Sequence, residues 1–109
     1  MKSVIVWSIA VMLLLASSQA QAQQINQRGH YVAKLVCSHC HAVEKRSRRS
    51  PNPAAPRFED IANSPDTTAT AIADALQTTP HRTMPNVRMN RDQLDDLITY
   101  ILSLKRTKK

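Results

Sequence analysis

Glycine and aromatic residues are scarce in this chain of 109 residues, which holds one Gly, one Trp, two Tyr and one Phe. No segment alternates apolar and polar residues with the period of two that indicates a β-strand. The two cysteines form a single pair, so no second pair is available to complete a zinc site. These absences argue against a sheet-based fold and predict an all-α domain.

The N-terminal segment is typical of a secretory signal peptide. A positively charged start precedes an apolar run at residues 4–16, and small residues with Ala-x-Ala spacing follow. We therefore expect cleavage after Ala20 or Ala22, so that residues 1–22 are a signal peptide and residues 23–109 form the domain. The run is shorter than the ~20 residues of a spanning helix. A retained anchor is the alternative, but we expect no stable membrane insertion after cleavage.

The most informative motif is Cys37-Ser38-His39-Cys40-His41, which has the Cys-x-x-Cys-His pattern of c-type haem attachment. Its two thiols can add to the two vinyl groups of one haem, and the following histidine can offer a ring nitrogen to the iron. A redox dithiol would need an α/β setting, and a zinc site would use His39 or His41 as a third ligand. Both remain weaker alternatives.

A covalent haem would also solve a problem of size. The mature chain has fewer than 90 residues and only three aromatic side chains, at Tyr31, Phe58 and Tyr100. Domains this small often need a disulfide, a metal or a cofactor to stabilise their core. The porphyrin would supply a large apolar surface for such a core.

Apolar spacing predicts four helices. The first runs from about residue 26 to 36 and leads into the haem motif. A short helix is expected at about 57–62, after the proline-rich loop 50–56. A third helix should be capped by Asp66 or Thr67 and end before Pro80. Its expected apolar face comprises Ala69, Ile72, Ala73 and Leu76.

The last helix is the most clearly defined. Asn90 is a good N-cap, and Asp92 lies in the first turn, where a negative charge suits the helix dipole. The helix has one continuous apolar stripe, made of Leu94, Leu97, Ile98, Ile101 and Leu102.

The second axial ligand decides what the haem can do. A methionine there closes the iron and suits electron transfer, whereas an open position would allow ligand binding or peroxidase activity. The mature chain offers Met84 and Met89. Met84 is favoured because it lies in a loop beside Pro85, which would stiffen the backbone. Met89 directly precedes the Asn90 cap and could equally fill the core.

The order of the haem motif, a Met-Pro loop and an apolar last helix resembles class I cytochromes c, in particular short bacterial single-haem ones. The resemblance covers essentially the whole mature region. It implies three to five helices wrapped around one haem c bound by two thioethers at Cys37 and Cys40. It further implies His41 and Met84 as iron ligands.

The resemblance also implies roles for residues around the haem. Gly29 would let the first helix cross the last one closely, near Tyr100. A proline carbonyl would orient His41, with Pro53 the closest match and Pro51 and Pro56 as rivals. Because the mature chain lacks Trp, candidates to replace its contact with a haem propionate are Arg57, Arg82 and Arg88.

The chain is basic, with a formal net charge of +7. Loss of Lys2 on export leaves +6 from side chains, and two propionates would lower this to about +4. Basic residues cluster at 45–49 and 105–109, which are either solvated charge runs or surfaces for acidic redox partners or anionic membrane. Nucleic acid is not expected as a partner of an exported haem protein.

These features predict a periplasmic, monomeric, single-haem electron carrier that is not itself an enzyme. The alternative is a cytochrome subunit of a larger periplasmic oxidoreductase complex. The size of the partner interface would discriminate between the two.

Overall fold

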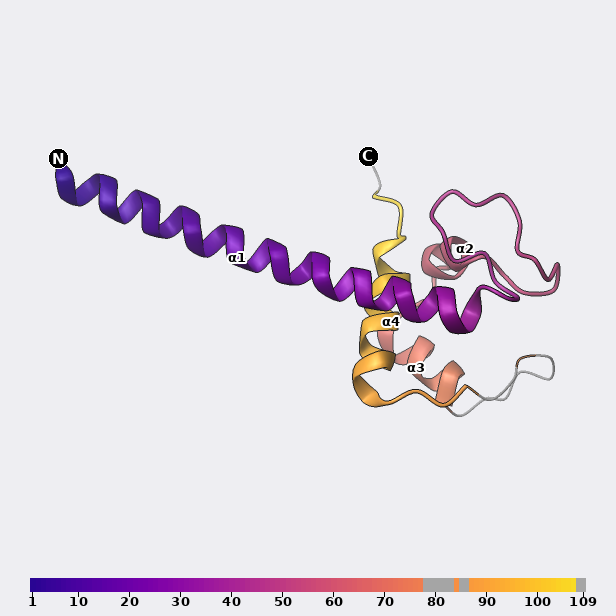
Figure 1. The fold of residues 1–109 in the computed structure, drawn as a ribbon. Coiled ribbons are helices and arrows are strands. Elements are labelled where there is room, and N and C mark those ends of the chain that lie inside the picture. Colours follow the sequence, from indigo (N-terminus) through magenta and orange to yellow (C-terminus); the bar gives the residue numbers. More distant parts are fainter. Residues whose placement is uncertain (78–83, 85–86, 108–109) are drawn as a thin grey trace.

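The computed structural model of the protein describes residues 1–77, 84 and 87–107. In order, its elements are α1 (Lys2–Val32), the π-helix η1 (Ala33–Cys37), α2 (Phe58–Asn63), α3 (Ala69–Gln77) and α4 (Arg91–Ser103). No strand occurs within the described ranges. The all-α prediction is therefore confirmed. The C-terminal part of α1 crosses α4 and runs on into η1, while α2 and α3 lie beside α4 (Figure 1).

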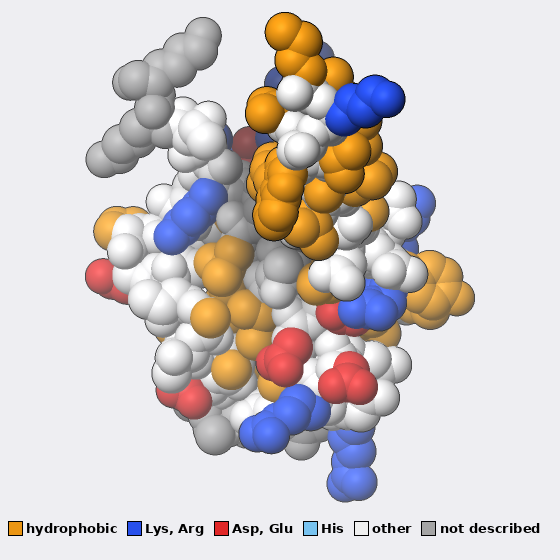
Figure 2. Space-filling model, turned by 90° about the vertical axis from the view of Figure 1, so that its left-hand side faces the viewer, with side chains coloured by type: hydrophobic (Ala, Val, Ile, Leu, Met, Phe, Trp, Pro, Cys, Tyr) orange, Lys and Arg blue, Asp and Glu red, His pale blue; other side chains and the backbone are white. Residues whose placement is uncertain are grey.

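The N-terminal half of α1 projects away from the other helices (Figure 1). Its large apolar side chains are exposed, and Figure 2 shows them crowded along the projecting helix. The helix is long and apolar enough to cross a membrane, a property that an N-terminal signal sequence shares. It runs without a break through Ala20 and Ala22, so the expected helix 26–36 forms its C-terminal end together with most of η1.

Gly29 makes the crossing of α1 and α4 possible. A Cβ at this position would lie 2.6 Å from Tyr100 Cβ, and closer still to the backbone carbonyl oxygen of Asp96. Arg28 adds an ion pair at the same place, with Nε 2.9 Å from Asp96 Oδ2. The Tyr100 hydroxyl donates a hydrogen bond of 2.7 Å to the Val43 carbonyl oxygen. The predicted close approach of the first and last helices is confirmed.

The caps of the two later helices differ in how well the sequence indicated them. At α4, the Asn90 side chain accepts from Gln93 N at 2.8 Å and the Gln93 side chain accepts from Asn90 N at 3.1 Å. This is a complete capping box. At α3, the expected caps Asp66 and Thr67 are wrong, because the Thr68 hydroxyl accepts from Ala71 N at 3.1 Å. Pro80, the expected end of that helix, lies outside the described residues.

The core is small and built mainly on α4. Leu97 is fully buried, and the rest of the predicted stripe of α4 is buried with it, except for Leu102, which is only partly buried. Side chains from the other segments pack against this face; they are Val32, Ala33, Cys37, Val43, Phe58, Ala62 and Ile72. The core therefore adjoins the motif that the sequence singled out.

Candidate functional site

The motif residues line a cavity of about 510 Å³, a size typical of ligand sites. Most of its wall is apolar, with Phe58 and Ile61 from α2, Ile72 and Leu76 from α3, and Leu97 and Ile101 from α4. Polar groups come from the motif and from Asn52, Ser64, Asp66 and Thr67. The cavity thus lies between all the later helices and the end of η1.

Local backbone geometry directs the motif toward this cavity. The last π-turn is closed by Ser38 N donating to Ala33 O at 3.1 Å. The next turn is tighter, because Cys40 N and His41 N both donate to Cys37 O, at 3.1 and 2.9 Å. Cys37, Cys40 and His41 are therefore brought to one wall of the cavity.

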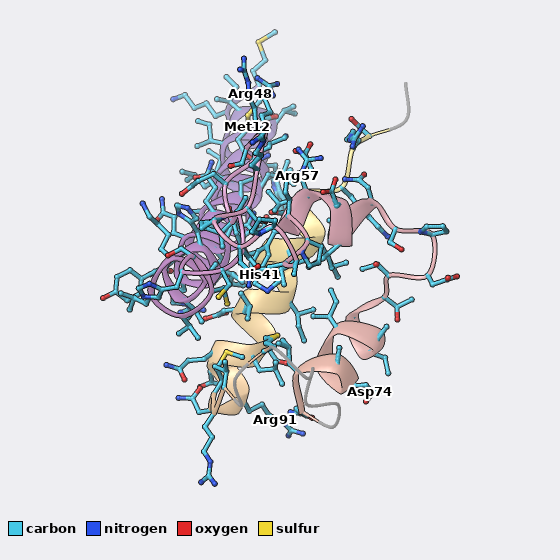
Figure 3. All side chains as sticks on the ribbon, turned by 90° about the vertical axis from the view of Figure 1, so that its right-hand side faces the viewer. Met12, His41, Arg48, Arg57, Asp74 and Arg91 are labelled. Carbon is cyan, nitrogen blue, oxygen red and sulfur yellow. The ribbon has the colours of Figure 1, made fainter. Side chains whose placement is uncertain are left out.

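His41 is held by one ring nitrogen, which leaves the other available. Its Nδ1 lies 2.6 Å from the Pro56 carbonyl oxygen. A carbonyl can only accept, so Nδ1 is the protonated nitrogen and Nε2 keeps its lone pair for a metal. The ring also lies against Phe58, at 5.5 Å between centroids. Figure 3 places His41 at the centre of the domain, in front of α4.

The expected role of Pro53 is therefore wrong, since Pro56 supplies the carbonyl. The reason is how the loop is tied down at both ends. Asn52 N donates to Cys40 O at 3.1 Å, and Phe58 N donates to Ala42 O at 2.9 Å. These two bonds fold the loop so that Pro56 faces His41.

The two methionines occupy different surroundings. Met84 lines the cavity together with His41 and both cysteines. Met89 instead packs against the core and lies beside Leu76 and Leu94, at a smaller hollow. The neighbours of Met84 on either side, including His81, Arg82 and Pro85, lie outside the described residues.

The thiols are free and differ in burial. Cys37 is buried and Cys40 is half-buried. Burial raises the pKa of the Cys37 thiol to about 11, so this thiol is protonated at neutral pH. Within the described residues, no three His, Cys, Asp or Glu side chains are grouped to hold a metal ion by themselves. Both thiols line the cavity, where they can bond to a ligand held in it.

Of the arginines expected near propionates, the two that the structure describes, Arg57 and Arg88, do not line the cavity. Arg57 is engaged elsewhere: its Nε lies 2.7 Å from Asp60 Oδ2, and its Nη1 donates to Ser47 O at 2.6 Å. This guanidinium holds the pKa of the Asp60 carboxyl below its usual value. Arg88 is exposed beside the smaller hollow. Arg82 lies outside the described residues.

Sequence reasoning missed four polar residues that line the cavity, Asn52, Ser64, Asp66 and Thr67. Asn52 had a readable signal, because it stands between two prolines in the loop that follows the motif. Thr67 had no readable signal in the sequence, because the hydrogen bond from its hydroxyl to the Ile61 carbonyl oxygen exists only in the folded chain.

A flat apolar cofactor with two reactive vinyl groups fits this donor set. The cavity provides two thiols, an oriented imidazole and a thioether along its wall, with apolar side chains over the rest. An all-α domain with this site is a c-type haem protein. The family model for cytochrome c matches residues 26–105, so the chain belongs to the cytochrome c family, as a class I member. No curated protein and no solved structure gives a match.

Membership establishes the general chemistry. The cofactor is haem c, which the family binds covalently through the Cys-x-x-Cys-His motif, and the function is haem-based electron transport with redox proteins as partners. Members of the family are generally electron carriers and are typically exported. The long apolar helix α1 fits an export signal.

Proposed function

We propose that this protein is a soluble, single-haem carrier that moves one electron at a time between proteins in the periplasm, and that it is not an enzyme by itself. The observation that carries the proposal is the gathering of both cysteines, His41 and Met84 around one apolar cavity. When bound there, the haem supplies reversible one-electron chemistry. The chain binds it, sets its ligands and keeps water from it.

Each site residue has one role in this proposal. Cys37 and Cys40 would form the two thioethers, and His41 would donate Nε2 to the iron while the Pro56 carbonyl holds its ring in place. Met84 would supply a further ligand to the iron, which would close it to small molecules and raise its reduction potential. Apolar residues of the cavity wall lower the local polarity and favour the reduced state.

Covalent attachment is tested on the purified mature protein. After denaturation and extraction with acidic organic solvent, the haem should stay with the polypeptide. Haem that leaves with the solvent would contradict the thioethers. Cys37→Ala, Cys40→Ala and His41→Ala should each prevent a normal holoprotein, whereas Met89→Ala should still form one. Without haem the small core should be largely unfolded, because binding and folding are linked.

The assignment of Met84 is tested against Met89 as its matched control. The ferric protein should have the far-red charge-transfer band of a sulfur–iron bond. Met84→Ala should abolish the band, lower the potential and let small ligands bind the iron. Met89→Ala should keep the band, since Met89 packs beside Leu94 rather than at the cavity. Loss of the band in Met89→Ala alone would reverse the assignment.

The partners in this proposal are acidic redox proteins, recognised through the basic loop 45–49. A carrier must bind and leave quickly, so its interface should be small and guided by charge. Reversing Arg46, Arg48 and Arg49 to Glu should slow electron transfer and leave the potential nearly unchanged. The alternative, a subunit of a larger oxidoreductase, predicts instead a complex that survives gel filtration at high salt.

A further inference from the structure

Two basic segments that are far apart in the sequence lie on either side of α2. One is the basic loop, residues 45–49, and the other is the basic tail, which begins at Lys105 after α4. Figure 1 shows the C-terminal tail and the loop after η1 flanking α2. The last two residues of the basic tail, Lys108 and Lys109, lie outside the described residues.

Glu59 of α2 joins the two segments. Its Oε2 accepts a hydrogen bond from Arg46 N at 3.1 Å, and its Oε1 lies 3.7 Å from Arg106 Nε. The carboxylate is largely shielded from solvent, with only 12% of the side chain exposed. Arg46 has a φ of 63°, a left-handed conformation that residues other than glycine rarely adopt. The bond to Glu59 holds the loop in this shape.

Other hydrogen bonds hold each segment in place independently of that carboxylate. On the tail, Arg106 N donates to Asn63 Oδ1 at 2.8 Å, and Asn63 Nδ2 donates to Leu104 O at 3.3 Å. On the loop, the Ser47 carbonyl accepts from Arg57 at 2.6 Å. Both segments are therefore held at α2 through backbone groups. Of their basic side chains, Lys105 Nζ also donates to Thr67 O at 3.4 Å and Arg106 pairs with Glu59, and both side chains remain exposed.

The basic residues of both segments are exposed and most of the nearby acidic groups are already paired. All six basic residues of the described parts are exposed: Lys45, Arg46, Arg48, Arg49, Lys105 and Arg106. Two nearby carboxylates are already engaged, Glu44 with His30 and Asp60 with Arg57. The backbone N of Arg46 and the guanidinium of Arg106 both lie within 3.7 Å of the same carboxyl group, so the two segments meet at Glu59.

We infer that the loop and the tail form one composite docking surface around α2, and that its occupant is the acidic face of a redox protein. This inference rests on the proposed function and deepens it. A protein partner is favoured over a membrane because both segments are bonded to residues at or next to the cavity. Lys105 Nζ donates to the carbonyl oxygen of Thr67, which lines the cavity. Arg57, which holds the loop, follows Pro56, whose carbonyl orients His41. A partner seated there is placed close to the cofactor.

The test uses the haem-loaded protein and an acidic flavodoxin as the probe. Three variants each remove one positive charge: Arg48→Gln in the loop, Arg106→Gln in the tail and Arg91→Gln as the matched control. Figure 3 places Arg91 at the opposite end of the domain from Arg48 and Arg57. Dissociation constants are measured by calorimetry at about 10 mM and about 1 M salt. Melting temperatures confirm that all variants are folded.

At low salt, Arg48→Gln and Arg106→Gln should each weaken binding roughly two- to fivefold. Arg91→Gln should bind like the wild type, and the differences should vanish at high salt. Equal losses of affinity in all three variants would show that only the net charge matters, and would contradict the composite docking surface. A loss confined to Arg48→Gln, or absence of binding by the wild type, would overturn it as well.

Two further measurements distinguish the docking surface from a membrane-binding surface and from the proposed carrier function. Vesicles of phosphatidylglycerol are titrated in parallel, with phosphatidylcholine vesicles as the control. Variants that lose vesicle binding but keep flavodoxin affinity would overturn the protein partner in favour of a membrane. Electron exchange between the wild-type protein and flavodoxin is followed by stopped flow. Its absence would contradict the proposed carrier function, while the three dissociation constants would still decide the surface.

Discussion

Single residues fix two geometric features of this molecule, the helix crossing at Gly29 and the orientation of His41. Gly29 has no space for a side chain, because a Cβ there would collide with backbone atoms of Asp96, which cannot rotate away. His41 is oriented by one carbonyl oxygen, that of Pro56, at 2.6 Å. In both cases a contact of a few atoms fixes how a whole helix or the cofactor's ligand is placed.

The first prediction concerns Gly29. Alanine normally favours a helix over glycine by about 1 kcal/mol. Here Gly29→Ala should instead destabilise the haem-loaded protein by roughly 1–3 kcal/mol, since overpacking forces α1 away from α4. Gln27→Ala, at an exposed position of the same helix, is the control. Denaturant unfolding measures both, and an unchanged or increased free energy of unfolding for Gly29→Ala would contradict the close contact.

Tyr100 predicts a dependence on alkaline pH. Burial, with a smaller contribution from the charge of Glu44, raises the pKa of Tyr100 to about 12. An unfolded tyrosine titrates near pH 10. Between these values the unfolded chain releases a proton that the folded protein keeps. The contribution of Tyr100 to the free energy of unfolding is therefore complete below about pH 10 and declines as the pH rises toward 12.

The matching variant is Tyr100→Phe. It removes the hydrogen bond to Val43 O and should cost about 1 kcal/mol at pH 7. This deficit should shrink above about pH 10, because the variant has no phenol to titrate. Denaturant unfolding followed by circular dichroism at a series of pH values measures both proteins. A deficit that stays constant up to about pH 11.5 would contradict the shifted pKa.

At the scale of elements, η1, α2 and α4 each make a different contribution to the structure. η1 is a π-helix that delivers Cys37 to the cavity, and π-turns occur frequently at functional sites. α2 ties the loop after the motif to the C-terminal end of the chain. α4 supplies most of the core and begins at a complete capping box.

The third prediction concerns that capping box. Asn90→Ala leaves Gln93 N without its acceptor and should destabilise the protein by about 1 kcal/mol. Gln93→Ala removes only the reciprocal bond and should cost less. Thermal unfolding of the haem-loaded variants compares the two. Equal stability of Asn90→Ala and the wild type would mean that the cap contributes nothing.

The same elements show what a sequence can and cannot reveal. Asn90 and the haem motif were readable because each depends on near neighbours in the sequence, whereas the role of Gly29 was implied by the resemblance to the family. Pro56 was not readable, because two backbone bonds from distant positions decide which proline faces His41. The sequence did not identify Thr68 as the cap of α3, because several adjacent polar residues could serve as caps. Nothing in the sequence joins Glu59 to both basic segments, since that junction exists only in the folded chain.

At the scale of the whole molecule, α1 combines two segments with different fates in our proposal. We propose that residues 1–22 are the export signal and that the remainder of the helix belongs to the domain. The projecting half of α1 makes no contribution to the core, whereas Gly29 and Val32 are buried. Removal of the signal should therefore leave the crossing with α4 intact.

The fourth prediction follows from this division. Protein purified from the periplasm should have an intact mass that lacks residues 1–20 or 1–22 and includes one haem. Its melting temperature should not depend on a few residues more or less at the new N-terminus, because that stretch is exposed. Cell fractionation is the control. Recovery of the full-length chain from the membrane fraction would instead identify α1 as an anchor.

The crossing at Gly29 also determines how the chain must fold. It joins Gly29 to Asp96 and Tyr100, so the long segment between them must close into one loop before the contact forms. The entropy cost of closure grows with loop length, and such non-local contacts slow folding. Cys37 and Cys40 follow the crossing directly. A haem tethered there would offer α4 a large apolar target early, so the covalent bond would act as a folding nucleus as well as an anchor for the cofactor.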